Sequence, residues 1–253
     1  MAAATVSSIF VYPIKSLSRI AVPESRIVPG GGLTHDREFA LFDPEGKVIN
    51  GKQHPLVHQI QASYDLAAFT VSLGDKEFHL IEDRLHLERW FGDYFGFQVV
   101  MKRNTSTGFP DDLDSPGPTI VGVASLDEVH RWFPLLDRPQ IGRRFRANIE
   151  IDGVPAFWED RLFGEPGEVE SFHIGEVQFW GNNPCARCAV PSRDPDTAEV
   201  VPDFAKVFSL RRQETLPAWA APGRFDHFYR LSVNTRVPET EVGKVIRIGD
   251  KIL

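Results

Sequence analysis

Apolar and polar residues alternate over short stretches in the first hundred residues, which is the pattern of half-buried β-strands. Residues 39–49 have apolar ends and an Asp-Pro-Glu-Gly turn at 43–46. The same alternation runs over residues 69–80 and is interrupted by a Gly-Asp pair at 74–75. Because Gly, Pro and Asp are the residues that tight turns require, the pattern predicts two β-hairpins.

Helical periodicity is confined to a few short segments. Residues 84–95 place four aromatic side chains on one side of a predicted helix, which ends at Gly96. Residues 125–128 (Ser-Leu-Asp-Glu) fit a capping box that opens a helix running to residue 133. One more helix is predicted over residues 203–212. The aromatic cluster is interpreted as ordinary core packing.

Short strands return after a polar segment at residues 103–118, which contains Pro and Gly and shows no periodicity. The predicted strands of the second half are 148–151, 172–180, 229–233 and 244–253. Many short strands, 20 Gly, 19 Pro and few helices indicate a mostly β (α+β) fold with two barrel-like, β-rich domains and a few short helices. We expect the first domain to span residues 1–105 and the second to span residues 106–253.

The charge balance and the absence of long apolar runs exclude several classes of protein. The 253 residues include 28 Lys and Arg against 35 Asp and Glu, a net charge of -7, which argues against nucleic acid and against an anionic membrane surface as partners. No apolar run approaches the roughly 18–20 residues of a spanning helix, and no basic leader is evident. We therefore expect a cytoplasmic protein with no membrane partner.

Both cysteines of the chain lie in one Cys-Ala-Arg-Cys motif, Cys185 to Cys188. Two cysteines are too few for a disulfide scaffold or a four-cysteine metal site. Thiolates are soft ligands and strong nucleophiles, so the motif fits a redox dithiol or part of a metal site. Prolines on both sides oppose a long helix continuing from Cys188 and favour a rigid loop. Two small residues in a structural loop explain the motif equally well.

Basic side chains that could hold a phosphate recur along the chain in three short motifs. They are the Tyr-Pro-Ile-Lys-Ser run at 12–16, the Asp-Arg-Glu-Phe run at 36–39 and the Arg-Arg-Phe-Arg-Ala-Asn run at 143–148. Each alone is more often a solvated, paired surface charge. If the fold brings them together, their guanidinium and ammonium groups could bind one anionic ligand.

These motifs occur together in an order that resembles one known family. The runs at 12–16, 36–39 and 144–149, the Cys-Ala-Arg-Cys motif and an Arg-Asp-Pro-Asp-Thr run at 193–197 follow one another as in MOSC-domain proteins. The resemblance includes the N-terminal β-barrel domain of the mitochondrial amidoxime-reducing component and its bacterial relatives. It spans nearly the whole chain, from Ile9 to Leu253.

The resemblance implies a molybdenum cofactor, a pterin dithiolene with a terminal phosphate whose metal is also bound by one protein cysteine. The second cysteine of the motif is the ligand in the family, so this role falls on Cys188, which is also the catalytic residue. The family positions that contact the pterin and its phosphate correspond here to Lys15, Ser16, Arg37, Ser115, Arg146, Asn148 and Arg187.

The implied activity is reduction of small N-hydroxylated compounds such as amidoximes, hydroxylamines or N-oxides, by abstraction of oxygen at molybdenum. The chain shows no ferredoxin domain after the second half. We therefore expect a separate electron-donor protein of the cytochrome, ferredoxin or flavin reductase type. Asp194 and Asp196 are near the motif in sequence, but nothing selects either as a proton donor.

Two alternatives belong to other functional classes. One is a non-catalytic carrier of the molybdenum cofactor or of sulfur, which needs an accessible thiol but, for sulfur alone, no phosphate-binding cations. The other is a Cys-x-x-Cys redox protein, which would leave the basic motifs unexplained. The basic motifs in both halves favour cofactor binding.

Overall fold

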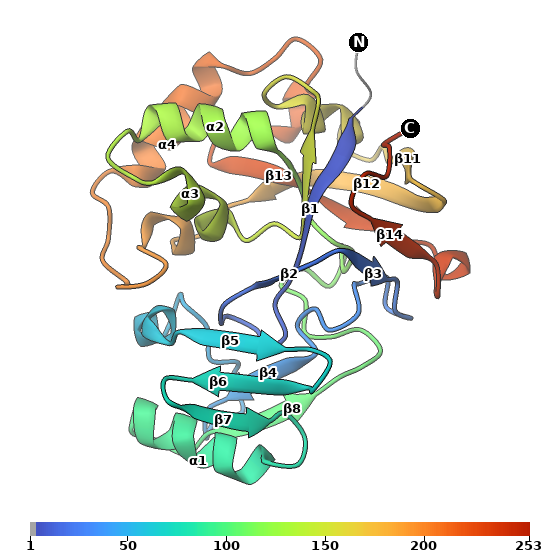
Figure 1. The fold of residues 1–253 in the computed structure, drawn as a ribbon. Coiled ribbons are helices and arrows are strands. Elements are labelled where there is room, and N and C mark those ends of the chain that lie inside the picture. The colour runs from blue at the N-terminus through green and yellow to red at the C-terminus, as the bar shows by residue number, and fades with distance from the viewer. Residues whose placement is uncertain (1–3) are drawn as a thin grey trace.

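The computed structural model describes residues 4–253, which fold into two lobes joined by several passages of the chain (Figure 1). Fourteen strands and four α-helices are present in this range. The expected fold class, mostly β of the α+β kind with few helices, is confirmed. No helix within residues 4–253 has the length and apolar character that crossing a bilayer demands.

The larger lobe is built on a seven-stranded sheet in the hydrogen-bonded order β11-β12-β13-β9-β10-β1-β2. Its strands are β1 (Thr5–Val11), β2 (Ile20–Val22), β9 (Ile120–Gly122), β10 (Ile149–Asp152), β11 (Glu170–Ile174), β12 (Val177–Ala186) and β13 (Arg230–Arg236). β9 and β10 run parallel, and the other neighbouring strands run antiparallel. The first strand of the chain thus pairs with a strand from its second half.

The smaller lobe contains two smaller sheets and one helix (Figure 1). Its elements are β4 (Phe39–Phe42) paired with β8 (Val100–Arg103), the meander β5 (Ala62–Asp65), β6 (Thr70–Leu73) and β7 (Lys76–His79), and α1 (Arg84–Phe95). A further pair, β3 (Glu24–Arg26) with β14 (Val245–Arg247), joins the first and last parts of the chain.

Separate apolar cores stabilise the two lobes. The smaller lobe packs α1 onto its strands through fully buried Leu87 and Phe91. In the larger lobe one core lies against the sheet, and a second lies under the helices α2 (Val123–Trp132), α3 (Arg138–Phe145) and α4 (Phe204–Glu214).

The hairpins and two of the predicted helices are confirmed. Gly96 ends α1 in the left-handed conformation, at φ 78°, which suits a residue without a Cβ. The helix predicted over residues 203–212 is α4. α3 was not predicted, because it is only eight residues long and three of the eight are arginine, although Ile141 and Phe145 lie four residues apart on its buried side.

The prediction that a capping box at residues 125–128 opens the helix is wrong, because α2 already begins at Val123. Ser125 lies inside the helix, where its hydroxyl donates to Glu159 Oε2 at 2.7 Å and accepts from the Phe157 amide at 2.6 Å. A Cβ at Gly122 would lie 2.8 Å from Glu159 Oε2. The buried carboxyl of Glu159 therefore occupies the helix start, where a capping side chain was expected.

The same region holds a buried ion pair that ties α4 to the 3-10 helix Trp158–Leu162. The Arg212 guanidinium donates to Asp160 Oδ2, and both side chains are almost fully buried. The adjacent Arg211 pairs with Glu214 at 3.1 Å, with about half of each side chain exposed. Two neighbouring arginines of one helix thus make a buried and an exposed pair.

We expect Arg212→Met to lower the free energy of unfolding by about 3 kcal/mol, because it leaves the Asp160 carboxylate buried without its cation. Arg211→Met removes the same charge from the exposed pair and should cost less than about 1 kcal/mol. Urea titrations of both variants check this. Equal losses in the two variants would contradict the assignment of a stabilising role to the buried pair.

Burial and the neighbouring Asp160 carboxyl raise the pKa of Glu159 to about 7. Since the pKa of an unfolded chain's Glu is lower, the folded protein binds the extra proton, and the contribution of Glu159 to stability falls as the pH rises toward 7. We expect Glu159→Gln to remove this loss, so that the variant gains stability relative to wild type between pH 5 and 8. A difference in unfolding free energy that stays constant with pH would count against it.

Candidate functional site

The pairing of β1 with β10 brings two basic motifs together. The strands are antiparallel, with Ile9 opposite Ile149, so the end of β1 lies beside the start of β10. The Phe10 amide donates to the Asn148 carbonyl at 2.7 Å, and Asn148 Nδ2 donates to the Phe10 carbonyl at 3.1 Å. The residues that follow β1 therefore meet the residues that precede β10.

The third basic motif joins them through the loop before β4. The Arg37 amide donates to the Tyr12 carbonyl at 2.8 Å, and the Tyr12 amide donates to Asp36 Oδ1 at 2.9 Å. Arg37 Nη1 also donates to Asn148 Oδ1 at 3.4 Å. Asn148 is almost fully buried, so it positions the Arg37 side chain rather than facing solvent.

The cysteine motif reaches the same place from the end of β12. The pairing of β12 with β13 is irregular between Gly181 and Asn183 and again between Pro184 and Ala186. Such irregularities bend a strand and turn its side chains in new directions. Cys185 lies in the bent end of the strand, and Cys188 lies in the loop beyond it, which agrees in part with the expected rigid loop.

All eight side chains selected from the sequence line one cavity of about 490 Å³. They are Lys15, Ser16, Arg37, Ser115, Arg146, Asn148, Arg187 and Cys188. They come from widely separated segments of the chain, including the polar segment that links the two halves. The volume is within the range of pockets that bind small molecules and cofactors.

Three of these residues adopt the left-handed backbone conformation that only glycine adopts freely. Their φ angles are 75° for Ser16, 50° for Arg37 and 53° for Arg146. Non-glycine residues in this region cost on the order of 1–3 kcal/mol and concentrate at functional sites. The fold therefore imposes these conformations at the positions where the side chains converge.

The cationic side of the cavity is already partly neutralised by the protein. Lys15 Nζ contacts Asp111 Oδ1 at 2.8 Å and donates to the carbonyls of Phe109 and Pro110 at 2.9 and 3.1 Å. Arg37 pairs with Asp36. The three contacts use the full hydrogen-bonding capacity of the ammonium, so an external anion must displace one of them.

The charges in the cavity act strongly on one another. Burial alone would lower the pKa of Arg37, but the Asp36 and Asp111 carboxylates outweigh it and raise that pKa. The surrounding protein would raise the pKa of Asp111, and the Arg37 and Lys15 cations lower it to about 2. Asp111 is therefore an anion at neutral pH, which the exposure of three quarters of its side chain to water also favours.

The two thiols have different surroundings. Arg187 Nη1 lies 2.9 Å from Cys185 Sγ, and its Nη2 donates to the Phe145 carbonyl at 2.7 Å. Cys188 Sγ accepts from the Val190 amide at 3.5 Å, the single hydrogen bond found for it among residues 4–253. The sulfur of Cys188 is therefore available to a further partner, whereas Cys185 contacts an arginine.

The cavity also contains polar residues that the sequence did not single out. They include Asn50, Lys52, His58, Asp111, Asp112, Asn183, Arg230 and Asn234, beside Asp36 and Cys185, which belong to the motifs already selected. The signal that could have found Asp111 and Asp112 is their place in the polar linker. A single Asn or His in a strand or loop carries no such signal.

Asp194 and Asp196, the two acids left open by the sequence, are held by arginines. Asp196 makes two contacts of 2.6 Å with Arg143, and Asp194 pairs with Arg144 at 3.3 Å. Neither carboxylate lines the cavity that contains Cys188. Asp194 Oδ1 also accepts the amides of residues 196 and 197, which makes the predicted turn.

Two kinds of known protein are similar to this chain in sequence. Human molybdenum cofactor sulfurase is 23% identical over 247 residues, covering 77% of this chain and 27% of the sulfurase. Human mitochondrial amidoxime reducing component 2 is 22% identical over 239 residues, covering 78% of this chain and 68% of that protein. The chain thus spans about a quarter of the sulfurase and about two thirds of the reducing component.

Among solved structures, the YUAD protein from Bacillus subtilis aligns with 99% of this chain and 94% of its own, at 12% identity and a TM-score of 0.39. Family profiles are more specific. The MOSC N-terminal beta barrel domain matches residues 3–98, and the MOSC domain matches residues 119–253. The chain belongs to the MOSC domain family.

Proposed function

We propose that this chain binds a molybdenum cofactor in the cavity between its lobes and uses it to reduce small N-hydroxylated compounds. The observation that carries the proposal is the convergence of Cys188 and the three cationic motifs on one cavity. Relatives named as amidoxime reducing components and molybdenum cofactor sulfurases support the cofactor class. We also propose that the chain consists of two domains, residues 1–105 and residues 106–253.

The cationic side of the cavity fits the phosphate of such a cofactor. Lys15, Arg37 and Arg146 line it together. Guanidinium groups bind phosphate oxygens through paired, charge-assisted hydrogen bonds, and a lysine adds a compact charge. Ser16, Ser115 and Asn148 would supply neutral contacts around these cations.

The side of the cavity that contains Cys188 fits a metal whose other ligands belong to the cofactor. Within residues 4–253 no group of three or more His, Cys, Asp or Glu side chains is placed to hold a metal ion. Cys188 can supply one soft thiolate, which suits a metal whose other sulfur ligands belong to a pterin dithiolene. Arg187, with a buried Nε that lacks a partner, borders the same region.

When bound, the cofactor would supply a two-electron reduction that cleaves the substrate N–O bond, with two protons consumed and water released. This chain's part would be to anchor the metal through Cys188, to fix the phosphate and to leave space for a small substrate. The electrons would come from a separate donor protein of the cytochrome, ferredoxin or flavin reductase type.

A non-catalytic carrier of the cofactor is the second candidate. The similarity to molybdenum cofactor sulfurases favours it, and so does the second thiol of Cys185 in the same cavity. A carrier and an enzyme use the same binding residues, so only turnover distinguishes them.

We expect Cys188→Ala to abolish both molybdenum content and reduction of benzamidoxime by protein from a host that makes the cofactor. Cys185→Ala is the matched control and should keep most of both, because Cys185 contacts Arg187 rather than presenting a free sulfur. Metal analysis and an assay with reduced methyl viologen as electron source provide the measurements.

Equal losses in the two cysteine variants would contradict the choice of Cys188. Stoichiometric molybdenum without turnover of amidoximes, hydroxylamines or N-oxides would overturn the enzyme in favour of the carrier. No molybdenum in folded wild-type protein from a competent host would overturn both.

We expect Asp111→Asn to strengthen binding of inorganic phosphate to the cofactor-free protein about fivefold, because the Asp111 carboxylate competes for Lys15. Asp114→Asn is the control, since Asp114 has the same charge in the same segment but does not line the cavity. Isothermal titration calorimetry measures both. Unchanged or weaker binding in Asp111→Asn would contradict this role of the carboxylate.

A further inference from the structure

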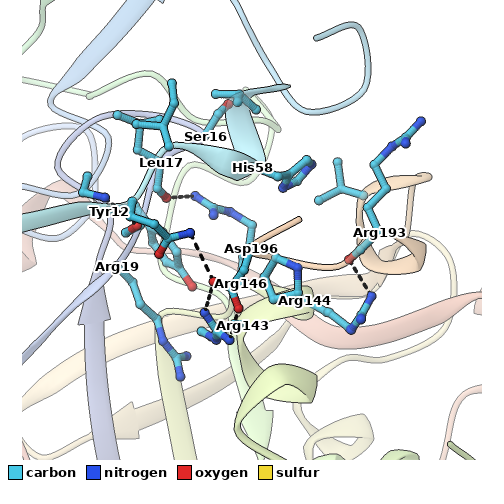
Figure 2. A pocket seen from close by; sticks show the side chains of 17 residues that line it. Tyr12, Ser16, Leu17, Arg19, His58, Arg143, Arg144, Arg146, Arg193 and Asp196 are labelled. Carbon is cyan, nitrogen blue, oxygen red and sulfur yellow. Dashed lines mark hydrogen bonds and ion pairs between the residues drawn. The ribbon is translucent and has the colours of Figure 1, made fainter. Parts of the chain in front are cut away.

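A second cavity of about 250 Å³ adjoins the first, and the proposed cofactor site does not account for it. Figure 2 shows the side chains that line this second cavity. Ser16, His58, Arg146 and Val190 line both cavities, so these side chains form the wall between them. The Val190 amide is the group that donates to Cys188 Sγ. The second cavity therefore lies directly behind the loop that carries the proposed metal ligand.

The lining of this cavity is strongly cationic. Five arginines border it against one carboxylate, that of Asp196. The arginines are Arg19, Arg143, Arg144, Arg146 and Arg193. In a chain with a net charge of -7, such a concentration of positive charge needs compensation from nearby anions or from a ligand.

Three of the five arginines are compensated by carboxylates of the protein. Arg143 binds Asp196 at 2.6 Å. The nearly fully buried Arg144 pairs with Asp194 at 3.3 Å and also donates to the carbonyl of Arg193. The remaining pair joins Arg19 to Glu150 at 3.6 Å.

Of the five arginines that line this cavity, Arg146 and Arg193 are the two whose hydrogen bonds within residues 4–253 go only to carbonyl groups. Arg146 Nη2 donates to the Leu17 carbonyl at 2.9 Å, and Arg193 Nη1 donates to the Ala198 carbonyl at 3.4 Å. Arg193 Nε is buried and has no hydrogen-bond partner within residues 4–253. The Asp111 and Asp36 carboxylates also act on Arg146, whereas no carboxylate within residues 4–253 pairs with Arg193. The charge of Arg193 therefore favours binding of an anion.

A buried histidine lies close to both of these arginines. His58 is 8% exposed, and its Nε2 has no hydrogen-bond partner in the described part of the chain. Burial, together with Arg146 and Arg193, lowers the pKa of His58 to about 4, so the ring is neutral at pH 7. A Cβ at residue 51 would lie 2.3 Å from Nε2, so glycine at this position is what admits the ring.

The remaining lining is mixed, with the polar side chains of Tyr12, Ser16, Ser18 and Gln61 beside a small apolar part. The apolar part comes from Leu17, Val57, Ile60, Val190 and Pro195. A space of about 250 Å³ equals roughly eight water molecules at their share of liquid volume. This is below the usual size of a drug-like pocket and suits a compact organic group.

We propose that the second cavity binds the carboxylate of a small organic molecule, with Arg193 as its charge partner and the apolar part of the lining around its hydrocarbon part. This deepens the proposed function, on which its biological meaning rests: the substrates would be N-hydroxylated compounds that also carry a carboxylate. The anionic end would lie in the second cavity. The N–O group would extend between the side chains shared by the two cavities into the first cavity, toward Cys188.

Isothermal titration calorimetry with benzoate and benzamide on the cofactor-loaded protein tests the charge requirement. The two probes have the same ring, and benzamide is neutral. We expect benzoate to bind at least about tenfold more tightly than benzamide, and Arg193→Gln to weaken benzoate about tenfold, as for loss of a charged hydrogen bond. Arg89→Gln, an equal charge change on the exposed surface of α1, should leave binding unchanged.

Three results would overturn the proposal: no benzoate binding, equal binding of benzoate and benzamide, or unchanged binding in Arg193→Gln with its thermal unfolding intact. Arg37→Gln adds a check on position, because Arg37 lines the first cavity and Arg193 lines the second. Loss of benzoate binding in Arg37→Gln but not in Arg193→Gln would place the anion in the first cavity instead.

The anion in the second cavity could also be a phosphate of an enlarged cofactor that carries a nucleotide. Mass analysis of the released cofactor distinguishes the two sources, and a nucleotide would overturn the substrate assignment. Molybdenum content, measured on the same samples, separates this test from the proposed function. Arg193-dependent benzoate binding in protein that takes up no molybdenum would sustain the anion site while the proposed function fails.

Discussion

The antiparallel pairing of β1 with β10 is the interaction on which the candidate site depends. It places the end of the first strand against the start of a strand about 140 residues later, through hydrogen bonds between Phe10 and Asn148 in both directions. Without this pairing, the residues after β1 and those before β10 would belong to separate lobes. With it, the lysine of one motif and the arginine of the other border one cavity.

The cations gathered at this junction explain several other features. The chain balances them locally, with Asp36 and Asp111 beside the first cavity and Asp194 and Asp196 beside the second. The left-handed backbone at Ser16, Arg37 and Arg146 shows that the fold also accepts conformational cost there. Charge and strain concentrated at one place are typical of a site built to bind an anionic ligand.

The sequence predicted those parts of the fold that depend on local pattern. The hairpin at residues 39–49 and helix α1 with its glycine end follow from turn chemistry and periodicity, and the structure confirms them. The eight site residues came from ordered motifs and a family resemblance. Their presence in one cavity agrees with that choice, while their roles as cofactor ligands remain a proposal.

The features that the sequence missed depend on contacts between distant residues. Ser125 was interpreted as a helix cap, but Glu159, more than thirty residues later, occupies that position. Helix α3 is stabilised by the contacts of its buried face, which its arginine-rich composition conceals. His58 gains its significance only from Gly51, Arg146 and Arg193, which no local pattern connects to it.

The most direct measurement of the central claim is a crystal structure of protein from a cofactor-producing host, with anomalous scattering recorded at the molybdenum absorption edge. We expect a molybdenum peak within bonding distance of Cys188 Sγ and electron density for the phosphate next to Lys15 and Arg37. A metal peak bound elsewhere, or a cofactor whose phosphate lies away from these cations, would contradict it.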